Sequence, residues 1–326
     1  MAFRQAGFSL IEILIVLAVL GVTMSFMIPS LLSFQSQGIS EISKDDLSDR
    51  ATRITAYLAE ELRMTGYMLT SDPKYADESP VALKHNTLTG TPLVTFSNSI
   101  LPNNANSSDD EITILKSRSF FPRVGVETDA AIGAGLTGNF INLDRAPTAT
   151  GEVIPGLSSA YSHITFSNHK VTYQVTSFES ITKTDNLRLN QGLEDPINGE
   201  TTAGAKDGTE LLAVRANRIY VTDGDLHLDD YEKDLKLDFG VDGLQFRYLL
   251  ADGSFSDDPL QPDQIRGIQF ALLIRSLTAE KGFHNTEDYS SQMGPNVSAG
   301  TYGPYNDRFR RILRTELIEV KNYAFD

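Results

Sequence analysis

The feature that most constrains this 326-residue chain is an apolar run from Phe8 to Ile28 that contains a single charged side chain, Glu12. At a rise of about 1.5 Å per residue, this run would form a helix about 31 Å long, which matches the thickness of bilayer hydrocarbon. We therefore expect a membrane-spanning helix. Because an unpaired carboxylate is costly in hydrocarbon, Glu12 is expected to have a function there.

The charges that flank this run predict its orientation. Arg4 lies on the short N-terminal side, and the mostly acidic stretch GISEISKDDLSD follows on the far side. Basic residues favour the cytoplasmic side, so we expect a single-pass inner-membrane protein with a cytoplasmic N-terminus and a periplasmic head. Two simpler interpretations explain less: a secretory signal lacks a clear A-x-A-like cleavage site here, and a plain anchor leaves Glu12 unexplained.

Composition excludes several classes of function. Arg4 and Glu12 cancel within residues 1–29, so the net charge of -15 falls entirely on residues 30–326. Such a surface repels phosphate backbones, which argues against nucleic acid as a partner. The chain has no Cys, which excludes disulfides, thiolate zinc sites, Cys nucleophiles and iron–sulfur clusters.

The stretch QAGFSLIEILIVLAVLG resembles the processing signal of type IV prepilins and the related pseudopilins, in which Gly, an aromatic residue and Glu fall at fixed offsets within an apolar helix. The resemblance implies that a prepilin peptidase cuts between Gly7 and Phe8, removes the leader peptide 1–7 and leaves Phe8 to be N-methylated. It also implies helix-softening roles for Gly21 and Pro29.

This resemblance offers two partners for Glu12. Cleavage would create a cationic amine at Phe8, and pairing between that amine and Glu12 of a neighbouring subunit would set the axial register of assembly. The alternative is a pair within one chain, since the two residues lie about one helical turn apart.

After Pro29 the sequence becomes amphipathic, and we expect the membrane and assembly helix 8–29 to continue as an amphipathic helix over 30–66. Its apolar positions recur at steps of three or four, which predicts one buried stripe. Gly66 is a plausible C-cap after Arg63, and Pro29 and Gly38 are the expected bends. A short coiled coil is the alternative for 42–65. The stripe comprises Leu47, Ala51, Ile54, Leu58 and Leu62.

Residues 67–326 predict a β-rich globular domain in the periplasm or outside the cell. Short β-branched and aromatic segments alternate with turn signals, without a βαβ rhythm, so the expected class is α+β, with the long N-terminal helix packed on one or two antiparallel β-sheets as in type IV pilins. The segments near 190–210 and 223–238 are interpreted as inserted loops. The predicted strands are PLVTFS, EITILKS, NFINL, YSHITF, KVTYQVTSFES, DNLRLN, LLAVRANRIYVT, LQFRYLL and IRGIQFALLIRS.

Three passages are similar to PilW-type minor pilins. In the first, AYLAEELRMTGY, the residues Glu61, Leu62, Arg63, Gly66 and Tyr67 mark the exit of the first helix. The other two are VDGLQFRYLLADGSFSDDPLQPDQIRGIQFALLIRS and the tail NDRFRRILRTELIEVKN, in which an Arg-rich turn leads into a last strand that closes at Asn322.

The sequence offers few patterns typical of catalysis or metal binding. The sequence has no HExxH, GxSxG or Gly-rich phosphate loop, so no enzyme activity is expected. An acidic run could hold calcium, although it lacks the EF-hand order and such runs are usually solvated; no other cofactor is expected. The calcium candidates are Asp223, Asp225, Asp229 and Asp230. The basic cluster Arg308, Arg310, Arg311 and Arg314 is expected to pair with carboxylates of its own domain or of a neighbour.

The sequence therefore predicts a minor pilin that helps to initiate or cap a type IV pilus and lies at the pilus tip. Its expected partners are prepilin peptidase, other minor and major pilins through the N-terminal helix, and the inner-membrane assembly machinery. Two alternatives stay open: a J-type minor pseudopilin of a type II secretion system, and an adhesin or binding module at the pilus tip.

Overall fold

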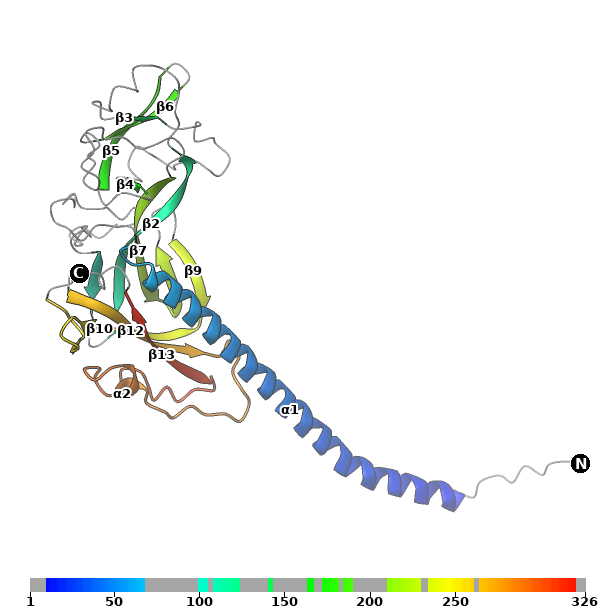
Figure 1. Cartoon of the computed structure of the whole chain (residues 1–326). Coiled ribbons are helices and arrows are strands. Elements are labelled where there is room, and N and C mark those ends of the chain that lie inside the picture. The colour runs from blue at the N-terminus through cyan, green and yellow to red at the C-terminus, as the bar shows by residue number, and fades with distance from the viewer. Residues whose placement is uncertain are drawn as a thin grey trace, which may run out of the picture.

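A computed structural model describes residues 10–67, 99–104, 108–123, 140–142, 163–166, 172–181, 184–189, 210–229, 234–260 and 264–320. A long helix, α1 (Leu10–Arg63), leads into a head built from two antiparallel sheets, as Figure 1 shows. The predicted α+β class, with a long N-terminal helix on antiparallel β-sheets, is confirmed.

The first sheet has nine strands and branches at β7. One edge of β7 pairs with β2; its other edge pairs with β4 at one end and with β8 at the other. The branch through β4 continues to β5, β6 and β3, and the branch through β8 ends at β9. The strands are β1 (Ile100–Asn103), β2 (Glu111–Arg123), β3 (Phe140–Asn142), β4 (His163–Phe166), β5 (Thr172–Ile181), β6 (Thr184–Leu189), β7 (Glu210–Thr222), β8 (Asp225–Asp229) and β9 (Asp234–Phe239).

The second sheet has four strands in the order β11-β10-β12-β13. A long excursion, residues 276–310, separates β12 from β13 and carries the short helix α2 (Ser290–Met293). A small apolar cluster, which includes Leu273, Met293 and Tyr302, packs this excursion on the sheet face opposite the main core. The strands are β10 (Val241–Leu250), β11 (Phe255–Ser256), β12 (Ile265–Arg275) and β13 (Arg311–Glu319).

One core joins the helix to both sheets. All five residues of the predicted stripe on α1 are buried, and they share a cluster with Ile219 of the first sheet and with Phe270 and Ile318 of the second. Burying apolar side chains from three layers in one cluster is what holds the helix to the head. The predicted stripe is thus confirmed.

The end of the helix also agrees with the sequence. Helix α1 ends at Arg63, and Gly66 follows with φ +68°, in the left-handed region that glycine adopts at low cost. The amide of Gly66 donates to the carbonyl of Leu115 on β2, at 2.7 Å, so the turn is tied to the first sheet as well.

One expectation about the chain differs from the structure. The segment 223–238 is a hairpin within the first sheet instead of an inserted loop, because Leu226 and Leu228 alternate with polar residues and point into the core. Helix α1 runs without a break through Pro29 and Gly38, in line with the expected continuation of the membrane helix into the amphipathic helix. The segment 190–209, the predicted strand PLVTFS and Asn322 lie outside the described residues.

Candidate functional site

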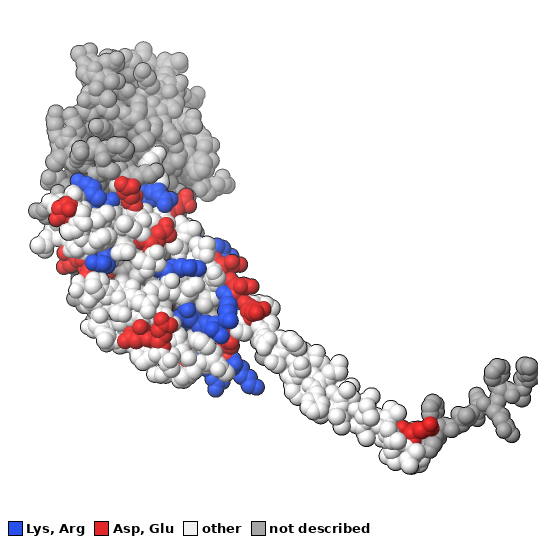
Figure 2. All heavy atoms as spheres, turned by 60° about the horizontal axis from the view of Figure 1, so that its bottom comes forward, with Lys and Arg blue, Asp and Glu red and all other residues white. Residues whose placement is uncertain are grey.

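The first candidate site is the exposed part of α1, which we call the stalk, residues 10–42. Apolar side chains on it are exposed from Leu10 (77%) to Ile42 (71%). Residues 13–40 contain no charged side chain, and the space-filling view in Figure 2 shows a white stretch of stalk between acidic atoms near its far end and the charged atoms beside the head. By length and composition, the stalk is long and apolar enough to cross a membrane.

The predicted assembly residues fall at the start of this stalk. Glu12 lies in the first turn of α1 and is exposed. A carboxylate in this turn interacts favourably with the positive end of the helix dipole. Gly7 and Phe8 lie outside the described residues, so the cleavage and methylation positions stay predictions.

The two predicted softening positions lie within continuous helix. Pro29 lacks an amide hydrogen, so the helical hydrogen bond to the carbonyl of Ser25 is missing there. A side chain at Gly21 would meet nothing within 4 Å, so the glycine is not needed for packing within the chain. The softening role of the two residues stays a prediction.

The second candidate site is the attachment of α1 to the head, where three polar contacts reinforce the apolar stripe. Arg50 is buried and lies 3.0 Å from the Asp238 carboxylate on β9. At the other end of the attachment, Glu61 accepts hydrogen bonds from Lys116 on β2 and from Asn217 on β7. These contacts fix the angle between the stalk and the head, since each joins α1 to a strand of the first sheet.

The third contact lies nearest the membrane end of the head, at Ser40. Its Oγ donates to Oε1 of Glu280 at 2.7 Å, and Arg310, the residue before β13, binds the same carboxylate. The bonds from Arg310 and Ser40 lower the pKa of Glu280 to about 2. The excursion 276–310 therefore reaches back to the stalk, a contact that the sequence did not reveal.

The predicted basic cluster pairs largely within its own domain. Arg311 is almost fully buried, binds Asp242 and Asp307 at 2.7 Å each, and stacks on Tyr305 with its guanidinium carbon 3.6 Å from the ring centre. Arg314 donates a long hydrogen bond of 3.5 Å to Ser48 on α1. The expectation of pairing with carboxylates of the same domain is confirmed for Arg310 and Arg311.

The calcium candidates divide along the β8–β9 hairpin. Asp225 pairs with Lys236, Asp229 is buried at the end of β8, and Asp230 lies outside the described residues. Among the described residues, no group of three or more His, Asp or Glu side chains converges as metal ligands would. Calcium binding stays an untested prediction.

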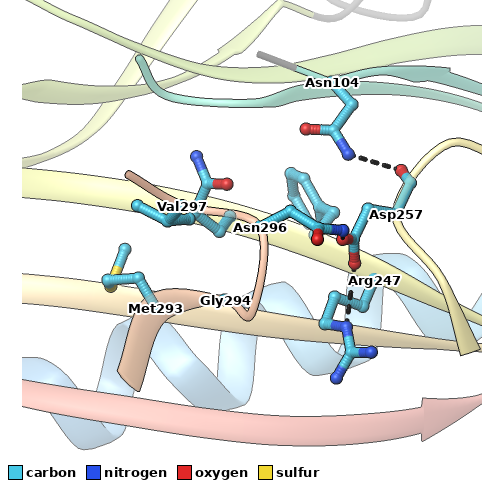
Figure 3. A pocket seen from close by; sticks show the side chains of 9 residues that line it. Asn104, Arg247, Asp257, Met293, Gly294, Asn296 and Val297 are labelled. Carbon is cyan, nitrogen blue, oxygen red and sulfur yellow. Dashed lines mark hydrogen bonds and ion pairs between the residues drawn. The ribbon is translucent and has the colours of Figure 1, made fainter. Parts of the chain in front are cut away.

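Residues that line a small pocket between the two sheets are hydrogen-bonded to one another. Figure 3 shows Asp257 between Asn104 and Arg247: the carboxylate binds Arg247 at 2.8 Å and Asn296, and the main-chain carbonyl accepts from Asn104 at 2.6 Å. The cavity is about 10 Å³, enough for a single water at most. Through these bonds the residues connect β10 with the β1 end of the first sheet and with the loop after α2.

Comparisons with known proteins agree with the N-terminal signal. The family model described as the prokaryotic N-terminal methylation motif matches residues 2–28. No curated protein matches the chain. Among solved structures, a type IV-like pilin from Thermus thermophilus is similar, with 12% identity and a TM-score of 0.39 over 85% of this chain and 98% of that one. The chain thus carries a prokaryotic N-terminal methylation motif at the start of a helix that is long and apolar enough to cross a membrane.

Proposed function

We propose that this chain is a minor pilin that is processed by prepilin peptidase, waits in the inner membrane and then takes part in initiating or capping a type IV pilus. The single observation that carries the proposal is the methylation motif over residues 2–28, which coincides with an exposed apolar stalk. Its role would be structural, not catalytic.

In the membrane, the stalk would span the bilayer with its N-terminus in the cytoplasm and the head in the periplasm. Glu12 near its start would then pair with the new amine of Phe8 on a neighbouring subunit, since a buried carboxylate is tolerated best next to a cation. Prepilin peptidase, other pilins and the inner-membrane assembly machinery are the partners that this role requires.

The large acidic head supports a priming or tip position rather than a repeated shaft position. The net charge of -15 lies on residues 30–326, so many copies packed side by side would repel one another. A few copies at one end of a filament meet less of this repulsion.

The test is the intact mass of the mature protein purified from its native membrane. We expect the loss of residues 1–7 and the gain of one methyl group on Phe8. A Gly7→Leu variant is the matched control, because it should keep the leader and still insert into the membrane. A native protein that still begins at Met1 would overturn the proposal.

A further inference from the structure

A second pocket of the head opens on the outer face of the second sheet, opposite the main core. It encloses about 270 Å³ between strands β10, β12 and β13 and the segment that begins with α2. This volume lies near the lower end of the range of about 300–1,000 Å³ that is typical of ligand pockets. The pocket therefore has room for one small ring-shaped ligand, but not for an extended chain.

The strand register explains which side chains gather on the pocket floor. On β10, the positions that alternate with core residues face outward, and they supply Gln245 and Arg247. The register places Gln269 of β12 opposite Arg247. It also places Ala271 of β12 beside Thr315 of β13. Neighbouring rows of the sheet thus bring two amides, a hydroxyl and a guanidinium to one surface.

Arg247 is a positioned hydrogen-bond donor. Its Nε donates to Oδ1 of Asp257 at 2.8 Å, and its guanidinium carbon lies 5.1 Å from the centre of the Phe255 ring. Figure 3 shows the two terminal nitrogens turned away from Asp257. Within the described part of the chain these nitrogens have no hydrogen-bond partner. Their N–H groups are therefore held in place and available to an acceptor.

Gln245 is a positioned acceptor in the same pocket. The residue is only 5% exposed, and its Nε2 donates to the carbonyl of Ser108 at 2.7 Å and to the hydroxyl of Tyr302 at 2.8 Å. Because a carbonyl can only accept, the amide nitrogen must occupy this position, which fixes Oε1 on the other side of the amide. Oε1 has no partner among the described residues. A fixed acceptor and a fixed donor therefore lie two residues apart on one strand.

The rest of the lining is uncharged. The side chains of Gln269, Ser291 and Thr315 make no hydrogen bond within the residues that the structure describes. Met293 and Pro295 add apolar surface along the wall formed by α2 and the loop after it. The pocket thus combines unused amides and hydroxyls with a small apolar patch.

Charge narrows the class of ligand. Among the described lining residues Arg247 alone is charged, and Asp257 already pairs with it. An anion would gain little there and would be repelled by the net charge of -15 on residues 30–326, whereas a cation would meet the guanidinium. A wholly apolar ligand would bury the amides and hydroxyls without partners. The class that remains is a neutral ligand rich in hydroxyl groups.

We propose that this pocket, which we call the outer-face pocket, binds one neutral sugar residue. The terminal nitrogens of Arg247 and Oε1 of Gln245 bind its hydroxyl groups, and Met293 packs against its C–H surface. This inference goes beyond the proposed function, because it depends on neither processing nor assembly. The outer-face pocket is defined by Gln245, Arg247, Gln269, Ser291, Met293 and Thr315.

The test is sugar binding by the full chain in dodecylphosphocholine micelles, a detergent without a sugar headgroup. The probes are the methyl glycosides of glucose, galactose and mannose, with glucuronate as the acidic counterpart, and saturation-transfer NMR follows binding. We expect at least one neutral glycoside to bind saturably with a Kd on the order of millimolar, as suits so small a ligand. Glucuronate should bind at least about threefold more weakly because of the acidic head.

Two variants locate the binding in this pocket. Gln269→Ala should raise the Kd at least about threefold through the lost hydrogen bond. Arg247→Lys should do the same, because lysine keeps a charge for Asp257 but lacks the guanidinium fork. Gln264→Ala is the matched control, since Gln264 is exposed on the head and does not line the pocket. Urea unfolding of each variant checks that the head is still folded.

The outcomes are decisive in both directions. Saturable binding by none of the neutral glycosides, tighter binding of glucuronate, an unchanged Kd in both pocket variants, or an equal loss in Gln264→Ala would each overturn the proposal. Failure of processing in the mass experiment would leave this result unaffected.

Discussion

The guanidinium of Arg50 on α1 lies 3.0 Å from the carboxylate of Asp238 on β9, and their side chains are only 6% and 14% exposed. Arg50 also donates to the main-chain carbonyls of Phe239 and Arg275, so its positive charge satisfies acceptors from both sheets. The helix and the two sheets therefore meet at one buried cation.

Removing this cation should destabilise the head strongly. Arg50→Met leaves the largely covered Asp238 carboxylate without its ion-pair partner, which costs about 3–5 kcal/mol in buried pairs. Urea unfolding of the full chain in detergent micelles, followed by tyrosine fluorescence, measures the loss. The double variant Arg50→Met with Asp238→Leu should recover most of it, and a single-variant loss below about 1 kcal/mol would contradict the role given to this pair.

Truncating the apolar stripe should loosen the helix from the head. Leu58 is fully buried between α1 and the sheets, and Leu58→Ala is expected to lower the free energy of unfolding by about 2–5 kcal/mol because it leaves a cavity. The matched control on the same helix is Ile42→Ala, which is exposed and should change stability by less than about 0.5 kcal/mol. Equal losses in the two variants would show that the stripe is not what joins helix and head.

The contact between Glu280, Arg310 and Ser40 should make the free energy of unfolding depend on pH only below about pH 5. The pKa of Glu280 is lowered to about 2, so its stabilising contribution is complete above the pKa of the unfolded chain, near 4.5. The contribution is then lost as the pH falls from there toward 2. Unfolding of wild type and Glu280→Gln should therefore differ by a constant amount above about pH 5 and converge below that value. A difference that grows as the pH falls would refute this assignment.

Replacement of the stalk acid should separate insertion from assembly. Glu12→Val removes the carboxylate without shortening the apolar run, so membrane insertion and processing should stay normal. Incorporation into pili should fall by at least about tenfold if the carboxylate sets the subunit register through a partly buried ion pair. Shear fractions of cells probed with an antibody to the head measure incorporation; Ser9→Val is the control, and full incorporation of Glu12→Val would count against the register hypothesis.

The sequence predicted those parts of the fold in which a short-range period repeats. The stripe from Leu47 to Leu62 follows the helical period, and the strands β7 and β12 are β-branched runs bounded by turns. The β8–β9 hairpin was missed because its many acidic residues indicated a solvated loop. The alternation Asp225, Leu226, His227, Leu228, Asp229 was the overlooked signal.

Contacts between distant segments could not be predicted in the same way. Ser40 and Glu280 are 240 residues apart, and nothing local to either residue indicates the other. For Arg50 the sequence held a weak indication of such a contact. Arg50 lies beside Ala51 within the apolar stripe, and a cation buried there needs a partner. Of the candidate site, the stalk was predictable from composition, whereas its attachment to the head depends on tertiary packing.

The pairing of α1 with β13 has a consequence for how the protein matures. Arg314 and Ser48 are separated by 266 residues, and Ile318 completes the core that covers the stripe. During synthesis the helix is made long before β13, so its apolar stripe stays uncovered while the intervening strands are added. Long-range closure of this kind is slow, and the stripe becomes fully covered only when the final sheet strand is in place.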